Sequence, residues 1–127
     1  MRTLGASIVG LSPGAVEVAF APNPSISQQH GFVHAGAVAA IADTAAGYAA
    51  LSLMPSGAGV LTTEFKINLV APATGDRIVA RGRVVKAGRI LTLAQAEVVA
   101  EAGGREKMVA LLIATMMTVQ GRDGLTD

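Results

Sequence analysis

One carboxylate stands out in the sequence as a candidate catalytic group. Asp43 is the only acidic residue in the stretch 35–54, which consists mainly of Ala, Gly and other small or apolar residues. Burying a charged group in such surroundings costs free energy unless the group is paired or used, so an isolated acid here favours a catalytic role. The alternative is a buried structural acid that is capped by the backbone or by Thr44.

Two histidines precede this stretch. His30 and His34 are four residues apart, which suits two metal ligands on one helix face. However, Gly31 lies between them, no Glu accompanies them as in the zinc protease motif, and no third ligand is evident. We therefore expect no metal and no other cofactor. His34 is expected to hold the loop or cap the helix rather than to act chemically, although it stays among the candidate site residues.

Composition narrows the classes of function. The 127 residues are 51% hydrophobic and 15% charged, with a net charge of +1 and no cysteine. A chain of this length and apolarity is expected to form one domain, 1–127, with a sizeable core. The absence of a basic block argues against nucleic-acid binding. The lack of cysteine excludes disulfides and thiol catalysis and fits a reducing compartment. Many small side chains and few charges favour a homo-oligomer.

Two apolar stretches resemble membrane signals but are better explained otherwise. The N-terminal stretch is interrupted by Ser, Gly and Pro residues, and Glu17 alternates with apolar neighbours as in a strand. The stretch 35–54 is long enough to span a bilayer, but it carries Asp43 near its middle, where lipid disfavours a charge. The sequence therefore predicts a helix buried inside a cytoplasmic protein that binds no membrane.

The elements that must position these residues follow one another in a simple order. Two N-terminal strands at most, one of them over 15–20, precede a helix that begins close to His34 and ends before Pro55. Four more strands are predicted over 60–70, 77–86, 90–101 and 107–119, and the tail 121–127 is expected to fray. Short turns force antiparallel neighbours, and the single helix must cover one face of the sheet. The fold class is therefore α+β.

Periodicity also assigns faces within two elements. On the helix, one side is predicted to carry Val38, Ile41, Ala45, Tyr48 and Ser52, while small residues surround Asp43 on another side. In the strand 60–70, alternation predicts one apolar and one polar face. The first face consists of Leu61, Thr63, Phe65, Ile67 and Leu69. The second consists of Thr62, Glu64, Lys66 and Asn68.

The segment 28–36 together with Asp43 resembles the phenylacetic-acid-pathway (PaaI)-like acyl-CoA thioesterases of the hotdog superfamily. That family has a His-Gly-Gly-like helix start and an acid nine residues after the His; here the start reads His34-Ala35-Gly36. A second matching stretch covers 65–72, and the order of elements agrees over nearly the whole chain. Ala35 stands where Gly is usual, but it keeps the backbone N–H.

This resemblance implies a curved antiparallel sheet wrapped around one long helix, and hydrolysis of a small acyl- or aryl-CoA thioester. A thiolate leaves readily because thiol pKa values are about 8.5. One carboxylate therefore suffices, and Asp43 is implied as general base or nucleophile. The N–H groups of Ala35 and Gly36 would polarise the thioester carbonyl. By the same resemblance, Thr62 would orient the water and Gln28 would assist the carbonyl or the water.

Along an ideal helix, Asp43 lies roughly 12 Å from His34. The resemblance implies that a homodimer closes this gap, with the helix start of one subunit facing the acid of its neighbour, and that two dimers often associate into a tetramer. Lys86 and Arg89 are candidate contacts for the CoA phosphates, as is the arginine row on the strand 77–86, and Asn68 is a further candidate for substrate contact.

Less specific interpretations compete with these roles. Gln28 can be an ordinary loop residue, Thr62 an ordinary strand residue, and the cations a solvated surface. At the level of the whole protein, one alternative is a non-catalytic acyl-CoA-binding module, since fold does not fix function. Another is a hotdog hydratase or dehydratase, which pairs a catalytic His with an acid; the position of Asp43 argues against it. The identity of the acyl group stays open.

Overall fold

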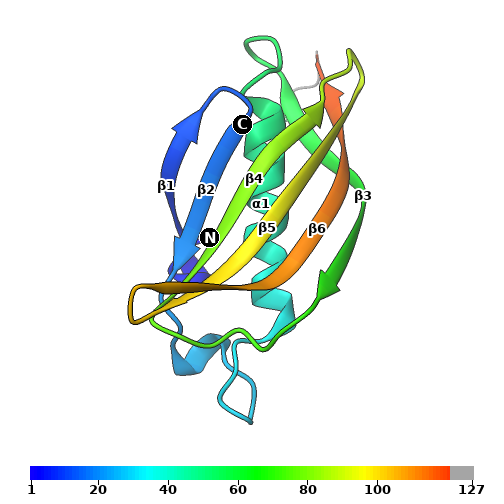
Figure 1. Ribbon diagram of the computed structural model, residues 1–127. Helices are drawn as coiled ribbons and strands as arrows, with labels where there is room; N and C mark the ends of the chain where they lie inside the picture. Colours follow the sequence, from blue (N-terminus) through cyan, green and yellow to red (C-terminus); the bar gives the residue numbers. More distant parts are fainter. Residues whose placement is uncertain (121–127) are drawn as a thin grey trace.

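Six strands form one antiparallel sheet that wraps around a single long helix (Figure 1). The computed structural model describes residues 1–120, so the expectation for the tail 121–127 lies outside the described residues. The elements in chain order are η1 (Arg2–Leu4), β1 (Ser7–Ser12), β2 (Ala15–Phe20), η2 (Pro24–Ile26), α1 (Ala35–Leu51), β3 (Gly59–Leu69), β4 (Arg77–Lys86), β5 (Leu91–Ala102) and β6 (Arg105–Val119). The α+β hotdog fold expected from the resemblance is confirmed.

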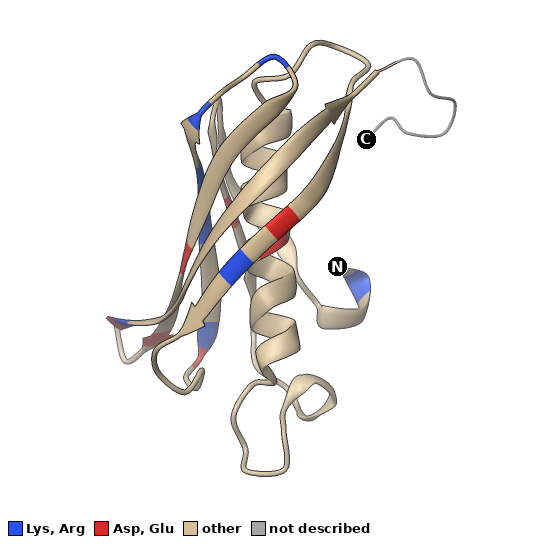
Figure 2. Cartoon of the chain, turned by 90° about the vertical axis from the view of Figure 1, so that its right-hand side faces the viewer, with Lys and Arg blue, Asp and Glu red and all other residues tan. Residues whose placement is uncertain are grey.

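The order of strands across the sheet places β3 at an edge. The order is β1-β2-β4-β5-β6-β3, and every neighbouring pair is antiparallel. Within residues 1–120, the strand that directly follows the helix therefore pairs with β6 alone. Figure 2 shows β3 running alongside α1. This seam between α1 and β3 is where the predicted site residues are found.

Both ends of α1 are set by side chains. His34 is the N-cap, and its Nδ1 accepts a hydrogen bond from the Gly36 N–H at 2.9 Å. At the other end, the Ser52 hydroxyl donates to the Ala49 carbonyl and accepts from the Gly14 N–H, which ties the helix end to the β1–β2 turn. No helix in the described part of the chain is long and apolar enough to cross a membrane.

The helix lies unusually close to the sheet because the facing residues are small. Ala42, Ala45 and Ala46 are fully buried. A Cβ placed on Gly82 of β4 would lie 2.3 Å from the carbonyl carbon and oxygen of Ala45, so only glycine allows this approach. The helix side predicted to carry Val38, Ile41, Ala45, Tyr48 and Ser52 is buried at its first three residues but not at Tyr48. Tyr48 is half-exposed, because the curved sheet covers most of α1 and leaves open only its side at the β3 seam.

The two predicted faces of β3 are not continuous, because a bulge interrupts the strand. The register with β6 shifts between Thr62 and Glu64. Thr62 pairs with the fully buried Met116 and so lies on the helix side, which leaves Leu61 on the outer side. Beyond the bulge the pattern reverses, and Phe65 lies on the helix side opposite the buried Ala114. An extra residue in a strand reverses the alternation, and sequence alternation alone cannot reveal it.

Candidate functional site

Asp43 and Thr62 form a hydrogen-bonded pair near the middle of the seam. The Thr62 hydroxyl donates to Oδ1 of Asp43 at 2.7 Å. The Met116 sulfur lies 3.3 Å from the same hydroxyl, but the hydroxyl has one proton and the carboxylate is the stronger acceptor. Oδ2 of Asp43 has no hydrogen-bond partner among residues 1–120. Oδ1 is thus held in place by Thr62, and Oδ2 is available to accept a further hydrogen bond.

This pair opens onto a hollow of about 230 Å³, here called the Asp43 hollow. Its walls come from α1, from the start of β3 and from the chain's first residue: Met1, Asp43, Thr44, Gly47, Tyr48, Val60 and Thr62. Gly47 carries no side chain that could cover the carboxylate. Asp43 itself is only partly buried. The carboxylate is therefore accessible to a water molecule or a substrate, and it is not a sealed structural acid.

The start of α1 forms a second part of the site. Its first N–H groups have no partner within the helix, and this end carries positive partial charge. The Gly36 N–H is bound by the His34 ring, so Nδ1 of His34 carries no proton in this arrangement. The Ala35 N–H has no hydrogen-bond partner among the described residues. Of the two predicted donors, Ala35 is therefore the open one.

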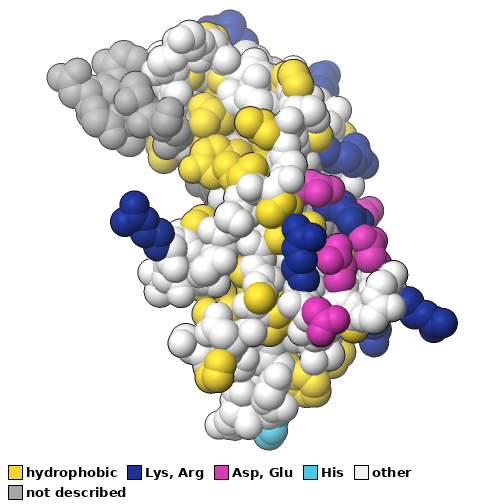
Figure 3. All heavy atoms as spheres, turned by 90° about the vertical axis from the view of Figure 1, so that its left-hand side faces the viewer, with side chains coloured by type: hydrophobic (Ala, Val, Ile, Leu, Met, Phe, Trp, Pro, Cys, Tyr) yellow, Lys and Arg dark blue, Asp and Glu magenta, His cyan; other side chains and the backbone are white. Residues whose placement is uncertain are grey.

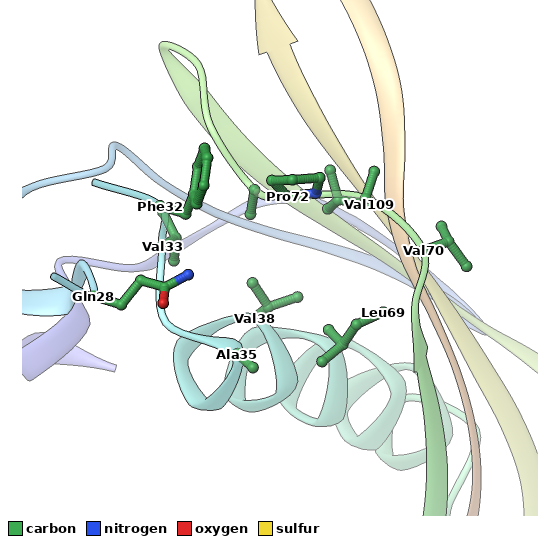
Figure 4. A pocket seen from close by; sticks show the side chains of 11 residues that line it. Gln28, Phe32, Val33, Ala35, Val38, Leu69, Val70, Pro72 and Val109 are labelled. Carbon is green, nitrogen blue, oxygen red and sulfur yellow. The ribbon is translucent and has the colours of Figure 1, made fainter. Parts of the chain in front are cut away.

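A larger hollow of about 370 Å³, here called the helix-start hollow, lies between the start of α1 and the end of β3 (Figure 4). Its side chains are apolar except for that of Gln28, whose amide end is turned toward the hollow in Figure 4. The remaining walls are formed by Phe32, Val33, Ala35, Val38, Leu69, Val70, Ala71, Pro72, Ala73 and Val109. Such a lining suits an apolar group with one polar contact.

Within one chain, these two parts do not meet. Asp43 and Thr62 line one hollow, while Gln28 and Ala35 line the other. The eight residues from Ala35 to Asp43 correspond to roughly 12 Å along the helix axis. Both hollows nevertheless lie on the same seam, because α1 and β3 contribute walls to each of them. His34 and Gly36 lie next to the helix-start hollow but do not line it.

The predicted substrate-contacting residues lie outside the two hollows. Lys86 and Arg89 are exposed at the β4–β5 connection. This connection lies at the C-terminal end of α1. The Gly14 carbonyl accepts a hydrogen bond from the Val84 N–H near the end of β4, and the Gly14 N–H donates to the Ser52 hydroxyl at the end of the helix. Neither cation forms an ion pair with a residue in the described part of the chain. Asn68 pairs with Leu111 beyond the bulge and so lies on the outer side of the sheet, away from α1.

Most of the arginine row is already occupied by acidic side chains (Figure 3). Arg81 forms a 3.0 Å ion pair with Glu17 and a two-point hydrogen bond with Glu106. The hydrogen bond to Glu106 raises the pKa of Arg81 and lowers the pKa of Glu106. Arg77 lies 3.7 Å from Glu101. This row therefore stabilises the outer face of the sheet. Among residues 1–120, His, Asp and Glu nowhere form a group of three that could hold a metal ion.

Sequence reasoning missed several walls of the two hollows. Periodicity grouped Tyr48 with Val38 and Ile41 on one side of the helix, and nothing in that grouping indicated that it lines the Asp43 hollow. Phe32 and Val109 meet in the helix-start hollow although they are far apart in the chain, and no local pattern signals this. Met1 beside Asp43 likewise has no sequence signal.

Comparison with known proteins points to one family. The sequence model of the thioesterase superfamily matches residues 30–107. A thioesterase family protein from Silicibacter pomeroyi is 49% identical, with a TM-score of 0.93 over 95% of this chain and 89% of that one. The E. coli PaaI protein from the phenylacetic acid degradation operon is 25% identical, with a TM-score of 0.84 over 94% and 83%. A Halobacterium salinarum protein named as a candidate esterase is 31% identical over 104 residues, covering 78% of this chain and 68% of the relative.

Proposed function

Because the chain belongs to the thioesterase superfamily, we propose that it hydrolyses a small acyl- or aryl-CoA thioester to a free acid and CoA, with Asp43 as the catalytic carboxylate. Membership of the family makes the protein a thioester hydrolase. The observation that carries the proposed role of Asp43 is its hydrogen bond to Thr62 at the wall of an open hollow. Thr62 holds Oδ1, so Oδ2 faces the reacting groups.

The chemistry requires little beyond these groups. As a general base, Asp43 takes a proton from water while the water oxygen bonds to the thioester carbon. As a nucleophile, its oxygen attacks the same carbon, and water then cleaves the resulting anhydride. In both routes the carbon–sulfur bond breaks and the thiolate of CoA leaves, taking up a proton from solvent. Thr62 keeps the carboxylate in one orientation in either case.

The developing negative charge on the carbonyl oxygen requires donors. The open Ala35 N–H at the positive end of α1 is the first of these in our proposal, and the Gln28 amide in the same hollow is the second. The Gly36 N–H already donates to Nδ1 of His34, so it can contribute to binding the carbonyl oxygen only while it also serves the helix cap. His34 thus positions the helix start and does not touch the reacting atoms.

A homodimer would complete the site. Asp43 and Ala35 of one chain are too far apart to act on the same carbonyl. Among residues 1–120, the part of β3 that follows the bulge pairs with β6 alone, and exposed apolar side chains lie on it at Phe65 and Leu69 and directly after it at Val70. We propose that two copies associate along this edge, which places the helix start of one beside Asp43 of the other. Two such dimers would form the tetramer. The absence of cysteine fits our proposed cytoplasmic location.

The test is to incubate the wild-type protein with a panel of aliphatic and aryl CoA esters and to identify the products by mass spectrometry. We expect equal amounts of free acid and CoA. Addition of water across a carbon–carbon double bond with the thioester intact would instead support a hydratase. Tight binding of the esters without any conversion would support a binding module. A hydratase is disfavoured because Asp43 occupies the position of the thioesterase acid, and because Nδ1 of His34 is engaged by the Gly36 N–H in the helix cap.

A further inference from the structure

The few aromatic residues of this chain are unevenly distributed. It contains three Phe, one Tyr and no Trp. Phe20 is buried in the core, whereas Phe32, Tyr48 and Phe65 are 36%, 40% and 44% exposed. All three exposed rings lie on the seam: Phe32 lines the helix-start hollow, Tyr48 lines the Asp43 hollow, and Phe65 lies on the helix side of β3. Half-exposed rings along one seam indicate a surface that contacts an apolar partner.

Tyr48 is the largest side chain in the second half of α1. Gly47 and Ala49 flank it in the sequence, so among the residues of α1 that line the Asp43 hollow its ring is the largest side chain. The ring lies five residues beyond Asp43, which is roughly 7.5 Å farther along the helix axis. Its hydroxyl forms no hydrogen bond with a residue in the described part of the chain. The ring thus extends the hollow in the direction away from the chain's own helix start.

The direction in which Tyr48 extends the site follows from the dimer, so this step rests on the proposed function. A twofold axis perpendicular to α1 makes the two helices antiparallel. If the helix start of one subunit lies beside Asp43 of the other, the residues that follow Asp43 lie beside the segment that precedes the partner's helix. That segment forms the partner's helix-start hollow. Tyr48 would then face this hollow from across the interface.

We propose that Tyr48 determines acyl specificity: its ring closes the partner's helix-start hollow and limits the length of the acyl group. A hollow of about 370 Å³ lies near the lower end of the range of ligand pockets, roughly 300–1,000 Å³. Its lining of apolar side chains selects an uncharged, apolar acyl group. The Asp43 carboxylate, held by the Thr62 hydroxyl, carries out the reaction, whereas Tyr48 sets which acyl group reaches it.

The experiment compares kcat and KM of wild type, Tyr48→Ala and Tyr48→Phe on straight-chain acyl-CoA esters from acetyl- to dodecanoyl-CoA. Tyr48→Leu serves as a second truncation if the alanine variant unfolds. Leu93→Ala is the matched control, because Leu93 is 39% exposed but pairs with Thr115 on the outer side of the sheet. For Tyr48→Ala we expect kcat/KM on long chains relative to short chains to rise roughly tenfold or more. Tyr48→Phe and the control should keep the wild-type profile.

Two results would overturn this inference in different ways. A wild-type chain-length profile in Tyr48→Ala, with KM raised equally for every ester, would show that Tyr48 contacts the CoA portion. That result would leave the proposed hydrolysis intact. If the wild-type protein hydrolysed none of the esters, the proposed function would fail, and the inference about Tyr48 would fail with it.

Discussion

The Thr62 hydroxyl lies 2.7 Å from Oδ1 of Asp43, across the seam between the edge strand and the helix. Only the bulge in β3 makes this contact possible, because it turns Thr62 toward the helix while Leu61 faces outward. The hydrogen bond fixes Oδ1 of a carboxylate whose other oxygen faces an open hollow. The orientation of the proposed catalytic oxygen therefore depends on an irregularity in a strand.

Removing this hydrogen bond should slow the reaction without unfolding the protein. Thr62→Val keeps the shape of the side chain but loses the donor. Because hydrogen bonds to charged groups contribute about 1.5–3 kcal/mol, we expect kcat to fall roughly tenfold or more. The measurement is the steady-state rate with the best CoA ester. Thr63→Val is the control, since the Thr63 hydroxyl donates to the Thr115 carbonyl outside both hollows. Equal rates for the two variants would remove Thr62 from the mechanism.

The cap at the start of α1 predicts a separate effect at His34. His34→Ala should lower the free energy of unfolding by about 1 kcal/mol, because the Gly36 N–H loses its partner. His34→Asn can supply a capping oxygen and should recover most of that loss. Urea unfolding followed by circular dichroism measures both. Full stability of His34→Ala would contradict the capping role. Loss of turnover in a well-folded His34→Asn would indicate a direct chemical role.

Close packing between helix and sheet predicts that Gly82 cannot be replaced. The added methyl group of Gly82→Ala would meet the backbone of Ala45 and Ala46, which cannot move aside as a flexible side chain can. We expect a loss of about 3 kcal/mol or more in the free energy of unfolding. Gly10→Ala is a suitable comparison, because its methyl group would meet the flexible side chain of Glu17. A stable, fully folded Gly82→Ala protein would contradict the close approach of helix and sheet.

The proposed dimer predicts that a charge on the free edge of β3 is disruptive. Phe65→Arg should halve the mass measured by sedimentation equilibrium at low protein concentration, because a buried unpaired charge disfavours association. Turnover should fall with it, since one chain holds only half of each site. Val9→Arg places the same charge on β1, at the opposite edge of the sheet. If Phe65→Arg kept both mass and activity, the shared site would have to be abandoned.

The sequence was sufficient to predict the elements and the cap at His34, and it singled out Asp43, whose catalytic role stays a prediction. Asp43 stood out because an acid in an apolar helix is costly, and His34 was expected to cap that helix. Local patterns could not predict the reversed faces of β3, because one inserted residue changes the alternation without a composition signal. They also gave no sign that Tyr48 lines a hollow, because its position beside β3 depends on how the sheet wraps around the helix. The hollows could not be predicted from the sequence, because residues far apart in the chain, such as Gln28 and Val109, come together only in the folded protein.

The central claim is that the Asp43 carboxylate performs the hydrolysis, and Asp43→Asn tests it most directly. The change removes the charge while keeping the size of the side chain. Glu97→Gln makes the equivalent change at an exposed acid that lines neither hollow. With the thermal unfolding midpoint unchanged, we expect kcat of Asp43→Asn to fall roughly 100-fold or more, while Glu97→Gln keeps the wild-type rate. A folded Asp43→Asn enzyme that hydrolyses CoA esters at the wild-type rate would contradict the account.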